Sequence, residues 1–164
     1  MPTLLTSLDK NTLTALDQIL HVRDEKASGT QGGPSVAGAN IRVLNTVVRN
    51  TIPGASLASN QITLPAGTYT CTASAPFFQG NGGRIRLVNV TDSSVLILGL
   101  DTYADSTVSV AIHCPLFGVF TLASPKVINL THQIELAKTT NGLGVYTSDT
   151  FVQVFASVFI TKIA

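Results

Sequence analysis

Short runs of alternating apolar and polar residues, separated by turn signals, make up most of the chain. The clearest run covers residues 68–75, where Tyr69, Cys71, Ala73 and Ala75 share one face and threonine or serine occupies the other. Strict alternation over such a run predicts a half-buried β-strand. About nine segments of this kind, spaced by glycine, proline and asparagine turns, predict an all-β protein, an antiparallel sandwich or jelly roll.

The closing segment, residues 150–163, is apolar on both of its faces. Phe151, Phe155 and Phe159 fall on one parity, while valine and isoleucine dominate the other. An antiparallel strand in a monomer usually turns one face to water and therefore alternates. The segment is thus either central in a sandwich or buried against a copy of itself. We favour the second interpretation because charged residues make up only 12% of the chain, against about 25% in ordinary soluble domains.

The first 26 residues carry a different pattern. Leu13, Leu16 and Leu20 recur at three- and four-residue spacing, which predicts a short amphipathic helix. Because a helix of this length is marginal alone, the leucine stripe must dock on something. It docks either on its own domain and symmetry mates or, as an arm, on a larger assembly. Residues 27–39 are rich in glycine, serine and proline and predict a linker. The predicted organisation is a helical arm (1–26), a linker (27–39) and a jelly-roll domain (40–164).

Net charge and motifs argue against several classes of function. A net charge of +1 provides no basic surface for nucleic acid or for an anionic membrane, so we expect neither as a partner. The three histidines share no metal-ligand spacing, and no nucleophile elbow is present. We expect Cys71 and Cys114 to be buried free thiols, and the alternative of a disulfide between them stays open at this point. Three aspartates lie in predicted loops: Asp101, Asp105 and Asp149. They could converge on a Ca²⁺ ion, but the sequence around them lacks the pattern of a calcium-binding loop. We expect no catalytic site, metal or cofactor.

A series of motifs follows in order from about residue 22 to the C-terminus, at residues 23–30, 32–33, 41–48, 50–57, 64–69, 74–76, 86–92, 118–122 and 152–156. Together these motifs resemble a small domain common in the virion proteins of tailed phages. The resemblance implies a trimeric jelly roll similar to tumour necrosis factor (TNF) and to the globular heads of complement-type proteins. Such domains form tail-fibre tips, needle knobs or decorations on the virion.

The resemblance makes the chain a candidate non-enzymatic virion protein, assembled in the host cytoplasm as a homotrimer, with the closing strand near the threefold axis. We expect aromatic side chains to form the trimer interface: Tyr69, Phe117, Phe151, Phe155 and Phe159. Only residues 1–39 precede the predicted jelly roll, too few for a shaft. This favours a capsid decoration or cement protein whose arm, through Leu13, Leu16 and Leu20, contacts other virion proteins, with the major capsid protein as the foremost candidate.

Two other functions stay open at this point. The alternative is a tail-fibre or needle tip that binds a host-surface receptor through its loops. A polysaccharide-degrading enzyme ranks last, because no pair of carboxylates can be nominated.

Overall fold

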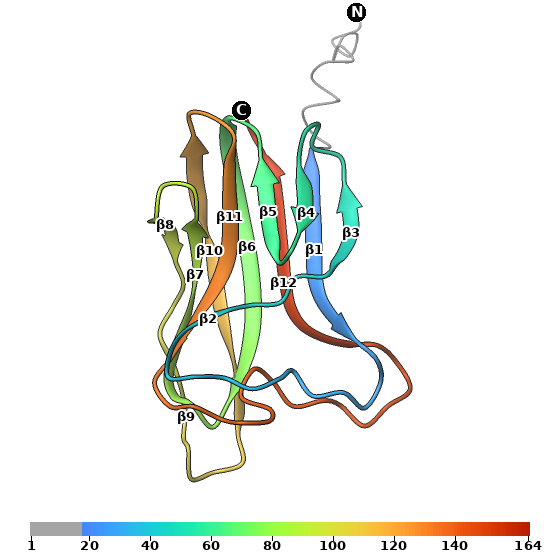
Figure 1. Ribbon diagram of the computed structural model, residues 1–164, viewed down its shortest axis with the longest axis vertical. Coiled ribbons are helices and arrows are strands. Elements are labelled where there is room, and N and C mark those ends of the chain that lie inside the picture. The colour runs from blue at the N-terminus through green and yellow to red at the C-terminus, as the bar shows by residue number, and fades with distance from the viewer. Residues whose placement is uncertain (1–17) are drawn as a thin grey trace, which may run out of the picture.

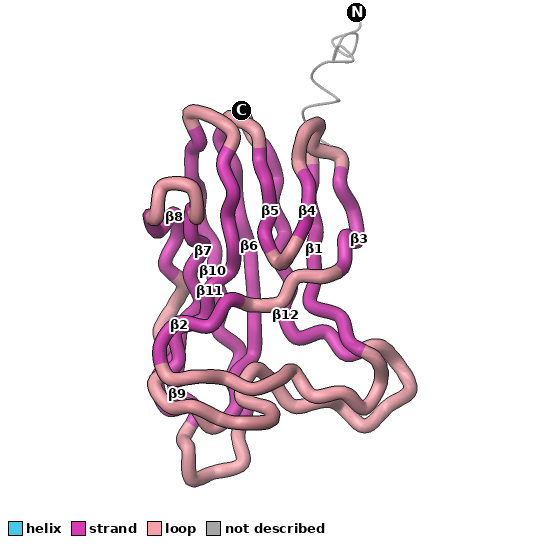
Figure 2. The backbone as a smooth tube through the Cα atoms, in the orientation of Figure 1, coloured by secondary structure: helices cyan, strands magenta, loops and turns pink. Residues whose placement is uncertain are grey.

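Two antiparallel β-sheets lie face to face in the part of the chain that the structure describes, residues 18–164 of a computed structural model (Figure 1). These residues form twelve strands, and the tube in Figure 2 passes only through strands and loops, without a helix. The prediction of an all-β antiparallel sandwich is therefore confirmed. No helix within residues 18–164 has the length and hydrophobicity that a membrane span requires.

The first sheet has five strands in the order β10-β6-β12-β1-β3. Their bounds are Ala111–Leu122 for β10, Gly67–Phe78 for β6, Gln153–Lys162 for β12, Ile19–Lys26 for β1 and Thr46–Asn50 for β3. The closing strand β12 thus lies in the middle of this sheet, between β6 and β1.

The second sheet follows the order β4-β5-β11-β7-β8, with β2 added beside β11 and β9 beside β7. Its strands are Gly38–Ile41 (β2), Ser56–Ala58 (β4), Gln61–Leu64 (β5), Asn81–Asn89 (β7), Ser94–Leu98 (β8), Thr102–Ala104 (β9) and Lys126–Ile134 (β11).

The core lies between the sheets and follows the alternation of the sequence. Tyr69, Cys71, Ala73 and Ala75 of β6 face inward and are at most 3% exposed. Opposite them, β11 contributes fully buried side chains at alternate positions, Ile128, Leu130, His132 and Ile134. Full burial of one large aliphatic side chain stabilises a fold by about 1.5–3 kcal/mol.

A proline lies inside each of the two longest strands that the structure describes. Pro76 is tolerated in β6, which continues to Phe78, because the ladder with β12 stops at Ser74 and, among the described strands, β10 is the one that pairs with β6 beyond it. Pro115 likewise lies within the single strand β10.

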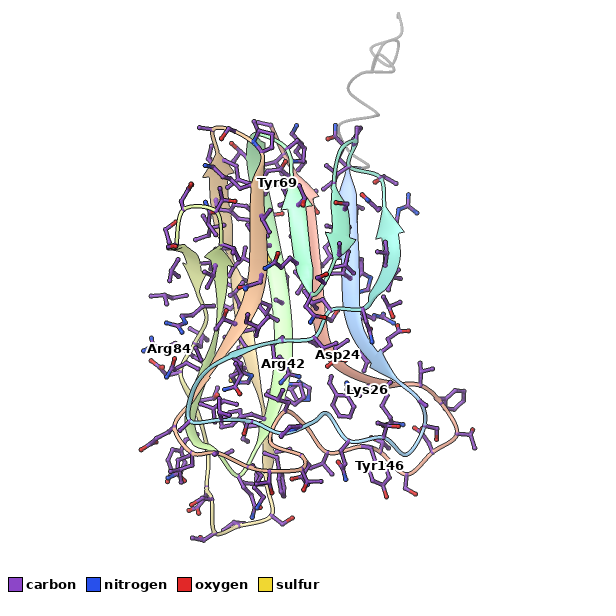
Figure 3. The ribbon with its side chains drawn as sticks, in the orientation of Figure 1. Asp24, Lys26, Arg42, Tyr69, Arg84 and Tyr146 are labelled. Atoms are coloured by element: carbon purple, nitrogen blue, oxygen red, sulfur yellow. The ribbon has the colours of Figure 1, made fainter. Side chains whose placement is uncertain are left out.

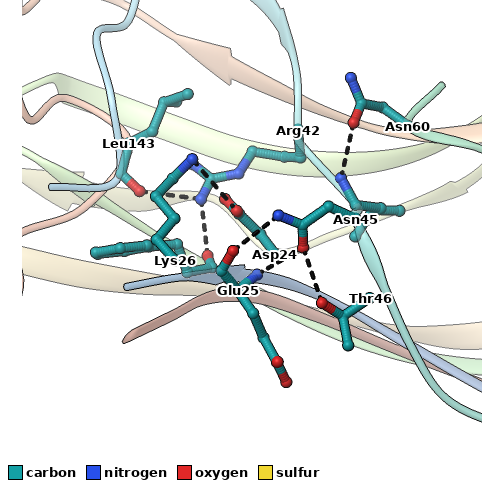
Figure 4. A network of polar contacts seen from close by, with 10 residues as sticks. Asp24, Glu25, Lys26, Arg42, Asn45, Thr46, Asn60 and Leu143 are labelled. Atoms are coloured by element: carbon teal, nitrogen blue, oxygen red, sulfur yellow. Dashed lines mark hydrogen bonds and ion pairs between the residues drawn. The ribbon is translucent and has the colours of Figure 1, made fainter. Parts of the chain in front are cut away.

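A fully buried arginine joins the two sheets. Arg42 follows β2 of the second sheet, and its guanidinium donates hydrogen bonds to the main-chain oxygens of Pro76 (3.2 Å), Leu143 (2.9 Å) and Phe155 (2.7 Å) (Figure 4). Pro76 and Phe155 belong to strands of the first sheet. Burial lowers the pKa of Arg42 to about 10, so the side chain keeps its charge at neutral pH.

The counter-charge comes from Asp24, which is 1% exposed. Lys26 Nζ lies 3.5 Å from Asp24 Oδ1. Burial raises the pKa of Asp24, while the charges of Lys26 and Arg42 act in the opposite direction. Since an isolated buried charge is expensive, these three side chains stabilise one another as a group.

Residues 27–37 form a strap across one end of the sandwich, alongside the loop that leads into β12. Gly32 N donates to Gly144 O (2.9 Å), Ser35 N to Lys138 O (2.8 Å) and Leu143 N to Gly33 O (3.0 Å). A Cβ on Gly32 would lie 2.6 Å from the oxygen of Leu143, so the close approach of the two segments requires glycine there. The predicted linker is therefore hydrogen-bonded into the domain.

The predicted helical arm is wrong for residues 19–26, which form β1. This strand pairs with both β12 and β3, so the jelly roll begins at residue 19 rather than at residue 40. Leu20 and Val22 point inward and are fully buried, whereas His21 and Arg23 point outward. Leu20 fits both the three- and four-residue spacing of a helix and the two-residue alternation of a strand. The segment is a strand because it pairs with β12 on one side and with β3 on the other.

Candidate assembly surface

The outer face of the five-stranded sheet carries the candidate site. The strand pairings set one row of side chains across it: Phe117 of β10, Thr72 of β6, Phe159 of β12, His21 of β1 and Arg49 of β3. Phe117 is 63% exposed and Phe159 is 41% exposed. Directly opposed residues in antiparallel strands point to the same face, so these side chains are neighbours.

Over three adjacent strands this face holds no aspartate, glutamate, lysine or arginine. Its outward residues on β10, β6 and β12 are apolar, hydroxyl-bearing, proline or histidine: His113, Pro115, Phe117, Val119, Thr121, Thr68, Thr70, Thr72, Ser74, Val154, Ser157, Phe159 and Thr161. We call this set the uncharged face. Charges enter only on its β1–β3 side, at Arg23, Glu25 and Arg49.

His21 marks the border between the uncharged face and the charged strands. Its Nε2 lies 2.9 Å from Ser157 Oγ and accepts a hydrogen bond from Arg23 Nε (3.2 Å), and its ring meets Phe159 edge-on at 5.6 Å between centroids. Burial and the charge of Arg23 lower the pKa of His21 below its ordinary value of 6.5, so the ring is neutral at pH 7. The row therefore stays uncharged as far as β1.

Three of the five residues predicted for a trimer interface are exposed. Phe117 and Phe159 lie on the uncharged face, and Phe151, 74% exposed, lies in the loop just before β12. The other two predictions are wrong, because Tyr69 and Phe155 are buried inside the protomer, at 0% and 3% exposure.

Each of the two corrections has a structural cause. Tyr69 lies between the sheets (Figure 3), stacks on Phe120 with 5.3 Å between ring centroids and donates its hydroxyl to Pro65 O (2.7 Å). Phe155 shares its parity with Phe159 in the sequence, but a β-bulge opposite Asp24 and Glu25 reverses the facing of β12 at this point. A bulge adds one residue and so sends the side chains before it to the opposite face.

The predicted arm contacts divide in the same way. Leu20 is fully buried in the core, which corrects its assignment to an arm. Leu13 and Leu16 lie outside the described residues, so their role stays a prediction.

Val119, Val154 and His21 also lie at this surface, and none of them was predicted there from the sequence. The outward position of Val119, which is 60% exposed, could have been predicted from the sequence, because Phe117 and Val119 alternate with the inward residues Leu116 and Phe120. Val154, at 42% exposure, had none, because the bulge determines its direction.

A cysteine and a histidine meet in the core without forming a reactive pair. Cys114 Sγ lies 3.3 Å from His132 Nε2 and 2.8 Å from Thr102 Oγ1. Burial raises the pKa of Cys114 to about 11 and lowers that of His132 to about 3. Both groups are therefore neutral at pH 7, whereas a nucleophilic cysteine needs its thiolate. Cys71 is also a buried free thiol, as predicted.

The loop aspartates are separated rather than clustered. Asp101 pairs with Arg84 (3.2 Å), Asp105 accepts hydrogen bonds from Thr107, and Asp149 accepts one from the main chain of Phe151. Within residues 18–164 no three histidine, cysteine or acidic side chains are placed to hold a metal ion.

The fold is that of a TNF-like jelly roll. The crystal structure of murine APRIL at pH 5.0 is similar over 87% of this chain and 97% of that chain, with a TM-score of 0.55 and 13% sequence identity. The globular domain of zebrafish complement 1qA protein covers 90% and 97%, with a TM-score of 0.52 and 13% identity. No family model matches the chain, and no curated protein matches its sequence. Identity this low establishes the fold alone, and the predicted jelly roll is confirmed.

Proposed function

We propose that the chain is a non-enzymatic structural protein that assembles as a homotrimer through the uncharged face. The carrying observation is that this face extends over three adjacent strands with exposed Phe117, Val119 and Phe159 and without an aspartate, glutamate, lysine or arginine. Monomeric soluble proteins rarely leave a continuous surface of this kind in water. A threefold arrangement of jelly rolls would cover it, and the interface would have the apolar character of an obligate oligomer.

The proposed setting is the virion of a tailed phage, where the trimer decorates the capsid. This rests on the motif series that resembles phage virion domains and on the low charge content of 12%. Gln18, where the described chain begins, and Ala164 lie at one end of the sandwich, and the long loops lie at the other (Figure 1). A trimer held by its N-terminal segment would thus turn its loops away from the particle.

Assembly is tested on the full chain by light scattering at micromolar concentration. A mass three times that of the chain supports the proposal, and a monomer at this concentration overturns it. Counting copies in the particle tests the setting, since hundreds of trimers indicate a decoration protein and a handful a tail component.

The gripping role of the N-terminal segment is tested by deletion. The deletion should end at residue 17, because removing residues 19–26 would remove β1. The shortened chain should remain trimeric and lose capsid binding. The double variant Leu13→Ser, Leu16→Ser keeps the full chain length. If the leucine stripe makes the contact, this variant should lose capsid binding as the deletion does. Undiminished capsid binding by the shortened chain would refute the arm.

The alternative, a receptor-binding tip, is favoured by one feature of the far end. Strand β9 and the loops on either side of it carry exposed apolar side chains, Leu100 (54%), Tyr103 (61%) and Val108 (56%). Binding of the purified trimer to host cells, lost on Tyr103→Ser, would support this function over decoration.

A further inference from the structure

A groove opens in the uncharged face where the five-stranded sheet divides. The ladder between β12 and β6 ends at the pair Ser157 and Ser74. Beyond it, β6 and β10 remain paired as far as Phe78 and Ala111. Toward the same end of the sheet, β12 and β1 remain paired to Gln153 and Lys26. The two ribbons separate, and the space between them is not closed by a further strand.

The groove consists of two adjoining depressions of about 290 Å³ and about 90 Å³. Both are lined by Pro76, His113, Val154 and Phe155, and neither is lined by lysine or arginine. The larger one also includes Val145 and Val152 together with a polar margin of Thr147, Asp149 and Gln153.

The wall on the loop side is fixed by hydrogen bonds. Gln153 Oε1 accepts from Thr147 N (2.8 Å), and Gln153 Nε2 donates to Asp149 Oδ1 (3.1 Å). A groove whose smaller depression is mainly apolar, and whose larger one combines apolar side chains with placed polar groups and a preformed wall, suits a single apolar side chain from a partner.

Phe151 has the complementary form. At 74% exposure it is the most exposed large apolar side chain among the described residues. Its main chain is held on both sides, because Phe151 N donates to Asp149 Oδ1 (3.0 Å) and Phe151 O accepts from Gln153 Nε2 (3.1 Å). Ser28 Oγ donates to Asp149 O and anchors the same loop to the strap. An aromatic ring presented on a fixed main chain loses little entropy when it binds.

The Phe151 ring and the groove lie at the same level along the strands. Phe151 lies two residues before the start of β12, and the groove is lined by Val154 and Phe155 at that start. The loop that leads into β12 extends past β1 at the lower right of Figure 1, and its residues Thr147, Asp149 and Val152 line one side of the groove, opposite Pro76 and His113. If one copy is rotated onto the next about an axis parallel to the strands, the ring of the first copy therefore stays level with the groove of the second.

We propose that the Phe151 ring of one copy inserts into the groove of the next copy, around the groove residues Pro76, His113 and Val154. The inference rests on the proposed trimer. In a cyclic trimer, each copy contacts its neighbour through two different patches, one facing each neighbour. The Phe151 ring is one such patch and the groove is the other, and both lie at the same level along the strands. A buried aromatic ring removes about 150–250 Å² from water, so three such insertions form a substantial part of the interface.

Cysteine cross-linking of the full chain tests the contact. Phe151→Cys and His113→Cys are placed in two separately tagged copies that are expressed together, purified and exposed to oxidised glutathione. Because the native Cys71 and Cys114 are buried, we expect a disulfide only between the two tagged chains. The control replaces Phe151→Cys by Leu98→Cys, an exposed position on the second sheet, and should give no cross-link.

The two proposals fail in different ways. An intact trimer in which the Phe151→Cys pair cross-links no more than the Leu98→Cys control overturns the insertion alone. A wild-type chain that is monomeric by light scattering overturns the trimer and the insertion with it. As a second measurement, Phe151→Ser should raise the dissociation constant of the trimer at least tenfold, and an unchanged constant counts against the insertion.

Discussion

The two outer faces of the sandwich differ in how their polar groups are satisfied. On the second sheet, Arg86 donates to Gln133 Oε1 (3.0 Å), Arg84 pairs with Asp101, and Lys126 Nζ lies 2.7 Å from Asp92 Oδ1. Arg84 projects outward from this side in Figure 3. The uncharged face of the first sheet has no such pairs. A face that carries ion pairs is stable in water as it stands, whereas the uncharged face gains by being covered.

Exposed apolar side chains by themselves do not separate the two faces. Across the second sheet the pairings give the row Ile41, Thr131, Arg86 and Leu98, in which Ile41 and Leu98 are 56% and 58% exposed. Arg86 and Thr131 separate these two side chains. In the row of the first sheet only Thr72 lies between Phe117 and Phe159. The difference that matters is therefore the charge between the apolar positions.

Phe159→Asp should have the largest effect on this difference. It places three carboxylates on a surface that the trimer would remove from water, and an unpaired buried charge costs about 3–5 kcal/mol. We expect the dissociation constant of the trimer to rise by roughly a thousandfold or more. The monomer should stay folded, since the side chain is 41% exposed. Analytical ultracentrifugation with circular dichroism measures both.

The matched control is Leu98→Asp on the second sheet, which should leave assembly unchanged. Equal effects of the two substitutions would show that the faces do not differ in function. Phe155→Asp is not a test of assembly, because Phe155 is buried within the protomer and its replacement should unfold the chain.

Arg42→Leu should weaken the fold without acting on either outer face. It removes three hydrogen bonds to main-chain oxygens and leaves Asp24 with Lys26 as its partner. We expect the free energy of unfolding to fall by about 3 kcal/mol, since unsatisfied buried groups cost about 1–3 kcal/mol each and part of this relaxes. Urea unfolding of the Phe159→Asp variant, with and without Arg42→Leu, measures the change free of assembly. A loss below 1 kcal/mol would contradict the bridging role.

The inward and outward positions of the longer strands could be predicted from the sequence. The alternation in β6 grouped Tyr69, Cys71, Ala73 and Ala75 on one face, and all four are buried; β7 shows the same alternation, with Ile85 and Leu87 inside and Arg84 and Arg86 outside. These strands keep a two-residue period over their whole length, so local pattern and packing agree.

The missed features depend on contacts between distant segments. The bulge that buries Phe155 lies where β12 pairs with Asp24 and Glu25, about 130 positions earlier in the chain, and a two-residue period read along β12 alone cannot reveal it. The interior position of Arg42 depends likewise on oxygens from three other segments. For the candidate site, Phe117 and Phe159 were predictable, but the neighbours that make the surface continuous required the register.

Acid should reduce stability through His132, beneath the second sheet. Its folded pKa of about 3 lies below the ordinary value of 6.5, chiefly through burial and also through the charge of Arg42. The unfolded chain therefore binds the proton more readily. Stability is fully present above pH 6.5 and falls toward pH 3, by up to about 1.4 kcal/mol per pH unit.

The comparison is between the Phe159→Asp monomer and the same chain with His132→Met, by urea unfolding at pH 7, 5 and 4. Methionine does not titrate, so the difference in unfolding free energy between the two chains should change with pH. Parallel pH profiles would exclude His132 as the source of acid sensitivity.

Arg86→Ala should have the smallest effect. It tests whether the charged side chain between Ile41 and Leu98 is what distinguishes the second sheet from the uncharged face. Arg86 donates to Gln133, but both side chains lie at a partly exposed surface where water can replace the bond. We expect a loss of less than about 1 kcal/mol in unfolding free energy and an unchanged trimer. If light scattering instead showed that the variant forms particles larger than the trimer, Arg86 would be the residue that prevents association through Ile41 and Leu98. The charge on this face would then protect the trimer from further association, which is a different task from stabilising the fold.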